Sequence, residues 1–195
     1  MRSCTGRRHS RRIKMYEIKR GGHADMKRIY PMMEFDFKDW ERPSLADCQI
    51  GMIRGAELLL LKDEAGLEAG YAYMLRDAAR RYALLGWLSV YPTVRGNGVG
   101  GEFLELIKAW YERYECVFIE VTEYPELEKA RKLADFYRRH GWKDSSVDYE
   151  IGGRETLLLQ RGDPPLRADL RGVIEAVYAP MYSPARLPKY VRVMA

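Results

Sequence analysis

The chain has 195 residues, a length typical of one domain with a sizeable hydrophobic core. Its hydrophobic content of 47% and charged content of 31% are those of a soluble globular protein. No apolar run approaches the ~18 residues that a membrane-spanning helix needs. The three cysteines, Cys4, Cys48 and Cys116, are too few and too widely spaced to predict a disulfide framework or a zinc site. We therefore expect a cytoplasmic protein with no metal and no membrane partner.

The net charge of +5 comes from the first 14 residues, which hold six arginines or lysines and no carboxylate. The other 181 residues carry 27 basic and 28 acidic side chains and are nearly neutral. We expect residues 1–14 to be a disordered tail. Such a tail could bind nucleic acid or an acidic partner, or it could be an extension upstream of a natural start at Met15. We favour the second interpretation and do not expect nucleic-acid binding.

The first half of the chain is predicted to form two helices and four strands. Apolar spacing and turn residues place a strand at 15–19, helices at 23–37 and 44–53, and strands at 57–62, 67–75 and 82–90. Pro31 lies inside the first helix, which we therefore expect to end early. Ser44 is a natural N-cap for the second helix, with Asp47 at its N3 position.

A glycine-rich loop follows the last of these strands and opens directly into an amphipathic helix. The loop runs from Arg95 to Gly101 and reads RGNGVGG. Glycines let the backbone approach a ligand closely, successive N–H groups can point at one anion, and the helix dipole adds partial positive charge. This stretch predicts a diphosphate site. The Lys and Ser or Thr of a Walker loop are replaced by Gly101 and Glu102, and the glycines do not match the dinucleotide spacing.

The glycine loop and its helix are followed by another buried strand and another helix. Residues 117–121 (VFIEV) predict a strand parallel to 82–90, because a helix connects the two. A helix is expected to open at Pro125 and to close at His140, with Gly141 as its C′ residue.

The C-terminal part is predicted to be a hairpin and an appended segment. Gly152 and Gly153 separate strands at 147–151 and 155–160. Residues 162–195 contain a short amphipathic run at 170–178 and are then Pro-rich. We expect these residues to form a short helix and a tail rather than a second domain.

Two motifs resemble those of one enzyme superfamily. From Val90 to Gly100 the chain reads V-x-P-x-x-R-G-x-G-x-G, and this resembles the acyl-CoA-binding motif of the GNAT N-acetyltransferases, [RQ]-x-x-G-x-[GA]. From Ala134 to Trp142 it reads ADFYRRHGW, which resembles the GNAT pattern A-x-x-F-Y-x-x-x-G-[FW] over F-Y-x-x-x-G-W, with Ala134 one residue closer to Phe136 than in the pattern. The predicted order β-α-α-β-β-β-α-β-α-β-β over residues 15–161 is also that of the GNAT core. The resemblance implies an α/β (α+β) GNAT-like acyl-CoA N-acyltransferase fold, with a mixed central sheet flanked by helices.

By this resemblance, acetyl-CoA is the co-substrate and lies where the strands at 84–90 and 117–121 splay apart. Backbone groups of Leu88 and Val90 would pair with the pantetheine, and the Val90 N–H would donate to the thioester carbonyl. The amine acceptor would attack directly, without an acyl-enzyme. The residues expected to bind the co-substrate are Leu88, Ser89, Val90, Arg95, Gly96, Asn97, Gly98, Val99, Gly100 and Tyr137.

Tyr137 falls on the family tyrosine that protonates the leaving thiolate. It also shares a helix stripe with Ala130 and Leu133, so it could instead be a buried aromatic residue; the two interpretations are compatible. The sequence departs from the family at Ala130, where GNAT proteins often have an asparagine that binds pantetheine.

An alkyl amine with a pKa of ~10.4 must lose a proton before it attacks. Glu120 and Glu123 are the carboxylates best placed to accept it, and strand alternation puts Glu120 on the face of Phe118 and Thr122. A salt bridge from Glu120 to Arg80, Arg81 or a helix arginine is an equally good interpretation. The other position common for a base, on the 84–90 strand, has Gly86 and Ser89 instead. Cys116 could carry an acyl group, but core packing is the better interpretation.

The favoured function is acetyl transfer from acetyl-CoA to an amine of a small molecule, peptide or protein. The alternative is a non-catalytic acyl-CoA-binding or regulatory module, which the substitution at Ala130 and the missing carboxylate both favour. The final strands and residues 163–195 could mediate a homodimer. Candidate acceptor contacts, which could equally be core aromatics or their neighbours, are Phe35, Phe37, Trp40 and Glu41.

Overall fold

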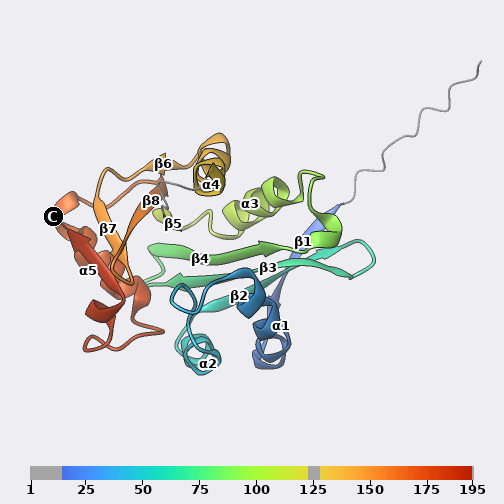
Figure 1. The fold of residues 1–195 in the computed structure, drawn as a ribbon, viewed down its shortest axis with the longest axis horizontal. Helices are drawn as coiled ribbons and strands as arrows, with labels where there is room; N and C mark the ends of the chain where they lie inside the picture. The colour runs from blue at the N-terminus through green and yellow to red at the C-terminus, as the bar shows by residue number, and fades with distance from the viewer. Residues whose placement is uncertain (1–14, 123–127, 195) are drawn as a thin grey trace, which may run out of the picture.

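The computed structural model describes residues 15–122 and 128–194, which form one sheet with helices on both faces (Figure 1). The helices are α1 (His23–Asp36), α2 (Leu45–Ile53), α3 (Val99–Trp110), α4 (Glu128–Arg139) and α5 (Leu170–Tyr178). The strands are β1 (Tyr16–Gly21), β2 (Glu57–Asp63), β3 (Glu68–Arg76), β4 (Tyr82–Val90), β5 (Cys116–Thr122), β6 (Lys143–Asp144), β7 (Asp148–Ile151), β8 (Arg154–Gly162) and β9 (Val191–Met194).

The sheet has the order β1-β2-β3-β4-β5-β8-β7-β9, with β6 paired to β8. Its described pairs are antiparallel except β4 with β5, which is parallel as predicted. The parallel ladder joins Tyr82–Leu85 to Cys116–Ile119 and ends there. The rest of β4, from Gly86 to Val90, has no register partner in the described part of β5. The two strands therefore part in the middle of the sheet, beginning at Gly86 and Glu120.

A β-bulge in β4 lies at this same point. The register with β3 passes from Tyr73 opposite Trp87 to Met74 opposite Leu85, so Gly86 is the extra residue. A bulge shifts the alternation of side chains by one residue. Trp87 consequently packs on the same sheet face as Leu84 rather than on the opposite one.

Two hydrophobic clusters cover the two faces of the sheet (Figure 1). Helices α1, α2 and α5 bury residues such as Ile29, Cys48 and Ile174 against one face. Helices α3 and α4 bury Phe103 and Tyr137, among others, against the other face. Each helix therefore contributes one apolar stripe, as the sequence periodicity predicts.

Helix α1 differs from the prediction because it continues through Pro31 to Asp36. A proline inside a helix loses a hydrogen bond and costs ~3 kcal/mol or more. Met26 and Ile29 before the proline and Met33 after it are all buried in the core, and this packing offsets the cost. Helix α2 begins as predicted, since the Asp47 N–H donates to the Ser44 hydroxyl at 3.1 Å.

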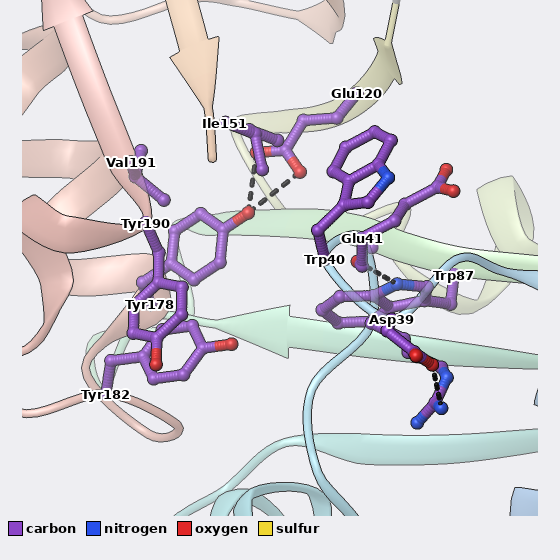
Figure 2. Close-up of a pocket in the computed structure, with 12 residues that line it drawn as sticks. Asp39, Trp40, Glu41, Trp87, Glu120, Ile151, Tyr178, Tyr182, Tyr190 and Val191 are labelled. Carbon is purple, nitrogen blue, oxygen red and sulfur yellow. Dashed lines mark hydrogen bonds and ion pairs between the residues drawn. The ribbon is translucent and has the colours of Figure 1, made fainter. Parts of the chain in front are cut away.

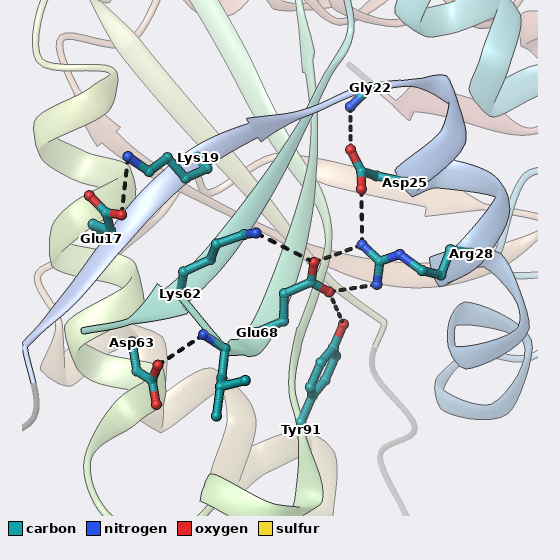
Figure 3. Close-up of polar contacts among 10 residues, drawn as sticks. Glu17, Lys19, Gly22, Asp25, Arg28, Lys62, Asp63, Glu68 and Tyr91 are labelled. Atoms are coloured by element: carbon teal, nitrogen blue, oxygen red, sulfur yellow. Dashed lines mark hydrogen bonds and ion pairs between the residues drawn. The ribbon is translucent and has the colours of Figure 1, made fainter. Parts of the chain in front are cut away.

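A polar network fixes α1 against the sheet beside the glycine loop (Figure 3). Arg28 donates from both terminal nitrogens to the two carboxylate oxygens of Glu68, each at 2.7 Å. Lys62 lies 3.9 Å from the same carboxylate, and the Tyr91 hydroxyl donates to it at 3.3 Å. Because Tyr91 directly follows β4, this network also fixes the chain where it leaves β4, ahead of the glycine loop.

The C-terminal residues form more structure than an appended helix and tail. Helix α5 lies where it was expected, but β9 was not predicted, and it pairs with β7 along its whole length. Helix α5 packs against β3 and β4. Arg186 donates to both oxygens of Asp47, at 2.8 and 3.3 Å, and so links this segment to α2 in the N-terminal half of the chain. Within residues 15–122 and 128–194, no helix is both long enough and apolar enough to cross a membrane.

Candidate active site

The glycine loop has the backbone conformation of an open cradle. Gly96 and Gly98 have φ angles of +83° and +80°, in the left-handed region that favours glycine. Gly98 is the N-cap of α3, and its carbonyl accepts from the N–H groups of Gly101 and Glu102. A Cβ atom at Gly96 or Gly98 would meet nothing within 4 Å. The space over the loop is therefore open to a ligand, next to the positive end of the α3 dipole.

The two following glycines bring α3 close to α4. A Cβ atom on Gly101 would lie 2.5 Å from Cε1 of His140, and one on Gly100 would lie 3.4 Å from Cζ of Phe136. The loop and the second motif are thus packed together, although about forty residues separate them. The imidazole of His140 fills the space that a side chain at 101 would need.

Arg95 and Ser89 are held by internal contacts. Arg95 donates from Nε to the Val90 carbonyl at 2.6 Å, and its Nη2 lies 3.4 Å from Oδ1 of Asp36. The Ser89 hydroxyl donates to Oδ2 of the same Asp36 at 2.6 Å. These contacts join the loop, β4 and the end of α1. Asn97 lies in the exposed part of the loop, and Val99 is buried at the first position of α3.

The backbone of β4 faces the gap between the strands at alternate residues. The Tyr91 N–H donates to the Ala69 carbonyl, which lies on the β3 side, at 2.8 Å. Successive N–H groups of a strand point to opposite edges. The N–H groups of Leu88 and Val90 therefore point away from β3, toward the place where β5 has diverged.

Tyr137 lies on α4 with its side chain in the α3–α4 core, where it is 6% exposed. This burial raises the pKa of its hydroxyl, which keeps the group protonated near neutral pH. Helix α4 ends in a Schellman motif, in which the Trp142 N–H donates to the Tyr137 carbonyl and the Gly141 N–H to that of Arg138. Gly141 has a φ of +86° and is the C′ residue, as predicted.

Glu120 is the first residue of β5 beyond its ladder with β4, although it still pairs with Leu158 of β8. Two tyrosines bind its carboxylate, and Figure 2 shows one of them, Tyr178. The Tyr178 hydroxyl lies 2.7 Å from Oε1 and 2.8 Å from Oε2, and the Tyr149 hydroxyl donates to Oε1. Burial raises the pKa of Glu120 to about 7, although the hydrogen bonds from Tyr149 and Tyr178 lower it. Of the arginines expected as alternative partners of Glu120, Arg81 pairs instead with Glu115.

A cavity of about 110 Å³ lies beside Glu120 (Figure 2). Its walls come from the α1–α2 connection, β4, β5, β7, α5, β9 and the segment before β9. The lining residues are Asp39, Trp40, Glu41, Arg42, Gly86, Trp87, Glu120, Ile151, Tyr178, Tyr182, Tyr190 and Val191. Aromatic rings and carboxylates therefore surround a space that is open to Glu120.

Residues 54–144, which contain the glycine loop, β5 and the Tyr137 motif, match the family model of the acetyltransferase (GNAT) domain. The chain carries a GNAT acetyltransferase domain. GNAT enzymes use acetyl-CoA as co-substrate. The glycine loop and the gap between β4 and β5 are the candidate binding regions for this ligand. The expected family is confirmed. No curated protein sequence matches the chain.

Solved structures share the GNAT fold seen here. A protein assigned to the GNAT family from Bacteroides thetaiotaomicron superposes with a TM-score of 0.70 at 18% identity, over 84% of this chain and 96% of that one. A spermidine N-acetyltransferase from Vibrio cholerae gives 0.58 at 12% identity, over 75% and 92%. A GNAT-family protein from Desulfovibrio desulfuricans gives 0.57 at 16% identity, over 76% and 99%. These likenesses confirm the predicted fold class.

Only two of the four predicted acceptor contacts lie at the cavity beside Glu120. Trp40 and Glu41 line the cavity, whereas Phe37 packs at the edge of the core and Phe35 is 85% exposed. Glu123 lies outside the described residues. Cys116 is buried, and burial raises the pKa of its thiol to about 12, as expected of a core residue.

Sequence reasoning missed four aromatic residues of the cavity beside Glu120. Trp87 could have been found only by placing the bulge at Gly86, because unbroken alternation puts it on the other face. Tyr178, Tyr182 and Tyr190 come from the C-terminal segment, and no pattern in the sequence places them beside Glu120. Within the described part of the chain, no group of three or more His, Cys, Asp or Glu side chains could hold a metal ion.

Proposed function

We propose that this GNAT domain transfers an acetyl group from acetyl-CoA directly to an amine, within a complex of the enzyme with both substrates. The observation that carries the proposal is the position of Glu120. It lies where β4 and β5 part, it lines an aromatic cavity, and its pKa is about 7. The glycine cradle and Tyr137 belong to the other face of the sheet. In this proposal, the two substrates would meet where β4 and β5 part.

On the donor side, the open loop with Gly96 and Gly98 would hold the diphosphate, and the N–H groups of Leu88 and Val90 would align the pantetheine. Acetyl-CoA supplies an activated acetyl group as a thioester. A backbone N–H that donates to the developing oxyanion is worth ~2.7–4 kcal/mol, and Val90 is the proposed donor. Tyr137 would protonate the leaving thiolate, since burial keeps its hydroxyl protonated.

On the acceptor side, Glu120 would take the proton of the amine. An alkyl amine with a pKa of ~10.4 is neutral at pH 7 only about one time in 2,500, a cost of ~4.6 kcal/mol. A general base is most effective when its pKa is close to the working pH, and the pKa of Glu120 is about 7. Trp40, Trp87 and Tyr178 line the same cavity, and aromatic faces attract an ammonium group before it loses its proton.

The first test is a calorimetric titration of acetyl-CoA into the wild-type protein and a Gly98→Glu variant. The new side chain would fill and charge the cradle, so we expect binding in the micromolar range for the wild type and none for the variant. Gly66→Glu is the matched control. Gly66 has a φ of +77° and equally open surroundings, but it lies in the β2–β3 turn, so binding is expected to persist. Equal binding by Gly98→Glu and wild type would refute the proposal that the glycine loop binds acetyl-CoA.

The second candidate function is a non-catalytic acyl-CoA-binding module. Two observations favour it: Ala130 replaces the family asparagine, and β4 presents Gly86 and Ser89 where a carboxylate could stand. The two functions differ in the release of CoA from acetyl-CoA in the presence of a panel of primary amines. Amine-dependent release that Glu120→Gln abolishes supports the enzyme. Binding of acetyl-CoA without release for any amine supports the module.

A further inference from the structure

Two tyrosines from different parts of the chain bind the carboxylate of Glu120. Tyr149 belongs to β7 and Tyr178 to α5, and both side chains are buried. Tyr149 donates to Oε1, while the Tyr178 hydroxyl is within hydrogen-bond distance of both Oε1 and Oε2. Oε1 thus has two tyrosine partners, and among the described residues Oε2 has only the hydroxyl shared with Oε1. A carboxylate can accept about four hydrogen bonds. The oxygen with remaining capacity is Oε2.

A column of stacked rings holds Tyr178 in place. Its ring lies 6.0 Å from that of Tyr182 with an interplanar angle of 19°, and Tyr182 lies 4.6 Å from Tyr190 at 8°. The guanidinium of Arg186 lies 5.4 Å from the ring of Tyr182 and 5.9 Å from that of Tyr190, and it also binds Asp47 of α2. The hydroxyl of Tyr178 is therefore held at the end of a rigid assembly built from residues 178–190.

We propose that Tyr178 and Tyr149 are positioning residues, which hold the carboxylate of Glu120 with Oε2 free to receive the proton of the acceptor amine. This inference rests on the proposed function, and it makes the C-terminal segment a part of the active site. The tyrosines do not replace Glu120 as the base. Burial beside Glu120 raises the pKa of both hydroxyls well above the ordinary value, so they remain donors.

The proton balance of the step is simple. One N–H bond of the substrate ammonium breaks and an O–H bond forms on Oε2, so that Glu120 becomes a neutral carboxylic acid and the amine a neutral nucleophile. The proton leaves to solvent before the next cycle. Besides Glu120, the charged side chains lining the same cavity are Asp39, Glu41 and Arg42, all from the α1–α2 connection, and Arg42 is paired with Asp39. Neither β4 nor β9 adds a charged residue to this lining.

The test compares Tyr178→Phe with Tyr111→Phe. Each substitution keeps the ring and removes a hydroxyl that binds a buried carboxylate, but Tyr111 donates to Glu57, on the other side of the sheet. The side-chain carboxyls are followed by ¹³C NMR from pH 5 to 9 in protein labelled at glutamate, with Glu120→Gln identifying the Glu120 signal. The same variants are assayed for the pH dependence of kcat/KM.

We expect Tyr178→Phe to raise the pKa of Glu120 by about one pH unit, because a donor to its charged form is lost. The acid limb of the kcat/KM profile should move by the same amount, and kcat should fall roughly tenfold as the carboxylate loses its orientation. Tyr111→Phe should change neither. In a Glu120→Gln background, Tyr178→Phe should cause no further loss. Tyr149→Phe is the second variant, and it should also raise the pKa of Glu120. It keeps the inference testable if Tyr178→Phe does not fold.

A Glu120 titration that is unmoved in Tyr178→Phe and in Tyr149→Phe overturns the inference, even if the wild type is active. A shift of the Glu120 pKa by the same amount in Tyr111→Phe also overturns the inference. If the wild-type protein transfers no acetyl group to any amine, the proposed function fails. In that case, the NMR titration still decides whether the tyrosines control the carboxylate.

Discussion

The raised pKa of Glu120 predicts a specific pH dependence of stability. The ordinary pKa of this carboxyl group is 4.5, and the folded protein raises it to about 7. Below pH 4.5 the group is protonated in both the folded and the unfolded chain, so it has no effect. Between pH 4.5 and 7 the unfolded chain releases the proton while the folded chain keeps it. The free energy of unfolding therefore falls as the pH rises through this window, and the loss is complete above it.

The size of the effect follows from the two pKa values. Each unit of difference is worth 1.36 kcal/mol, so a shift from 4.5 to about 7 makes the full loss about 3 kcal/mol. Glu120→Gln has no titrating group and escapes this loss. Any fixed cost of placing an amide beside Tyr149 and Tyr178 is the same at every pH. The variant should therefore gain about 2 kcal/mol on the wild type between pH 5.5 and pH 8.

Urea unfolding of both proteins at a series of pH values measures this difference. Other titrating groups are common to the two proteins, so they cancel when the free energies at one pH are subtracted. The slope m should be the same for both proteins, which shows that the unfolded states are comparable. A difference between variant and wild type that stays constant from pH 5.5 to 8 would show that Glu120 ionises in the folded protein at its ordinary pKa. The proposed role as a base matched to neutral pH would then have no support.

Two further predictions concern the glycine loop and the proposed acid. Gly101→Ala should lower the free energy of unfolding by ~1–3 kcal/mol, because the new Cβ would lie 2.5 Å from the His140 ring. In a His140→Ala background the same change should be neutral or stabilising; destabilisation there as well would contradict the contact. Tyr137→Phe should lower kcat by about 10²-fold or more. Its calorimetric affinity for acetyl-CoA should stay near that of the wild type, and an unchanged kcat would exclude Tyr137 as the acid.

The parts of the fold that could be predicted from sequence depend on local chemistry. Glycines with positive φ at 96, 98 and 141 mark the loop and the helix end, and only a few residue types tolerate that conformation. The parallel pairing of β4 with β5 follows because a helix separates two buried strands. The side of the sheet that Glu120 occupies follows from alternation along β5, which has no bulge in its described register.

The features that were missed depend on contacts between distant residues. Helix α1 continues through Pro31 because core packing on both sides of the proline outweighs a local preference. Strand β9 is four residues long, and it forms because β7 offers it an edge. The partners of Glu120 are 29 and 58 residues away in sequence. No periodicity in the sequence connects a strand glutamate to tyrosines at such distances, and a nearby arginine was the more natural local candidate.

The break between β4 and β5 explains why Glu120 can lower the stability of the folded protein when it ionises and still serve as a proton acceptor. A carboxylate in a continuous ladder would be covered by its neighbours, and one at the surface would titrate near pH 4.5. Glu120 is the first residue of β5 after its ladder with β4 ends, and it lines the same cavity as the bulge glycine Gly86, which has no side chain to cover it. It is therefore buried enough for its pKa to rise and yet open to a cavity. The stability lost by ionising this group is the same free energy that makes it a proton acceptor near pH 7. A substitution that stabilises this position at pH 8 should therefore reduce its reactivity.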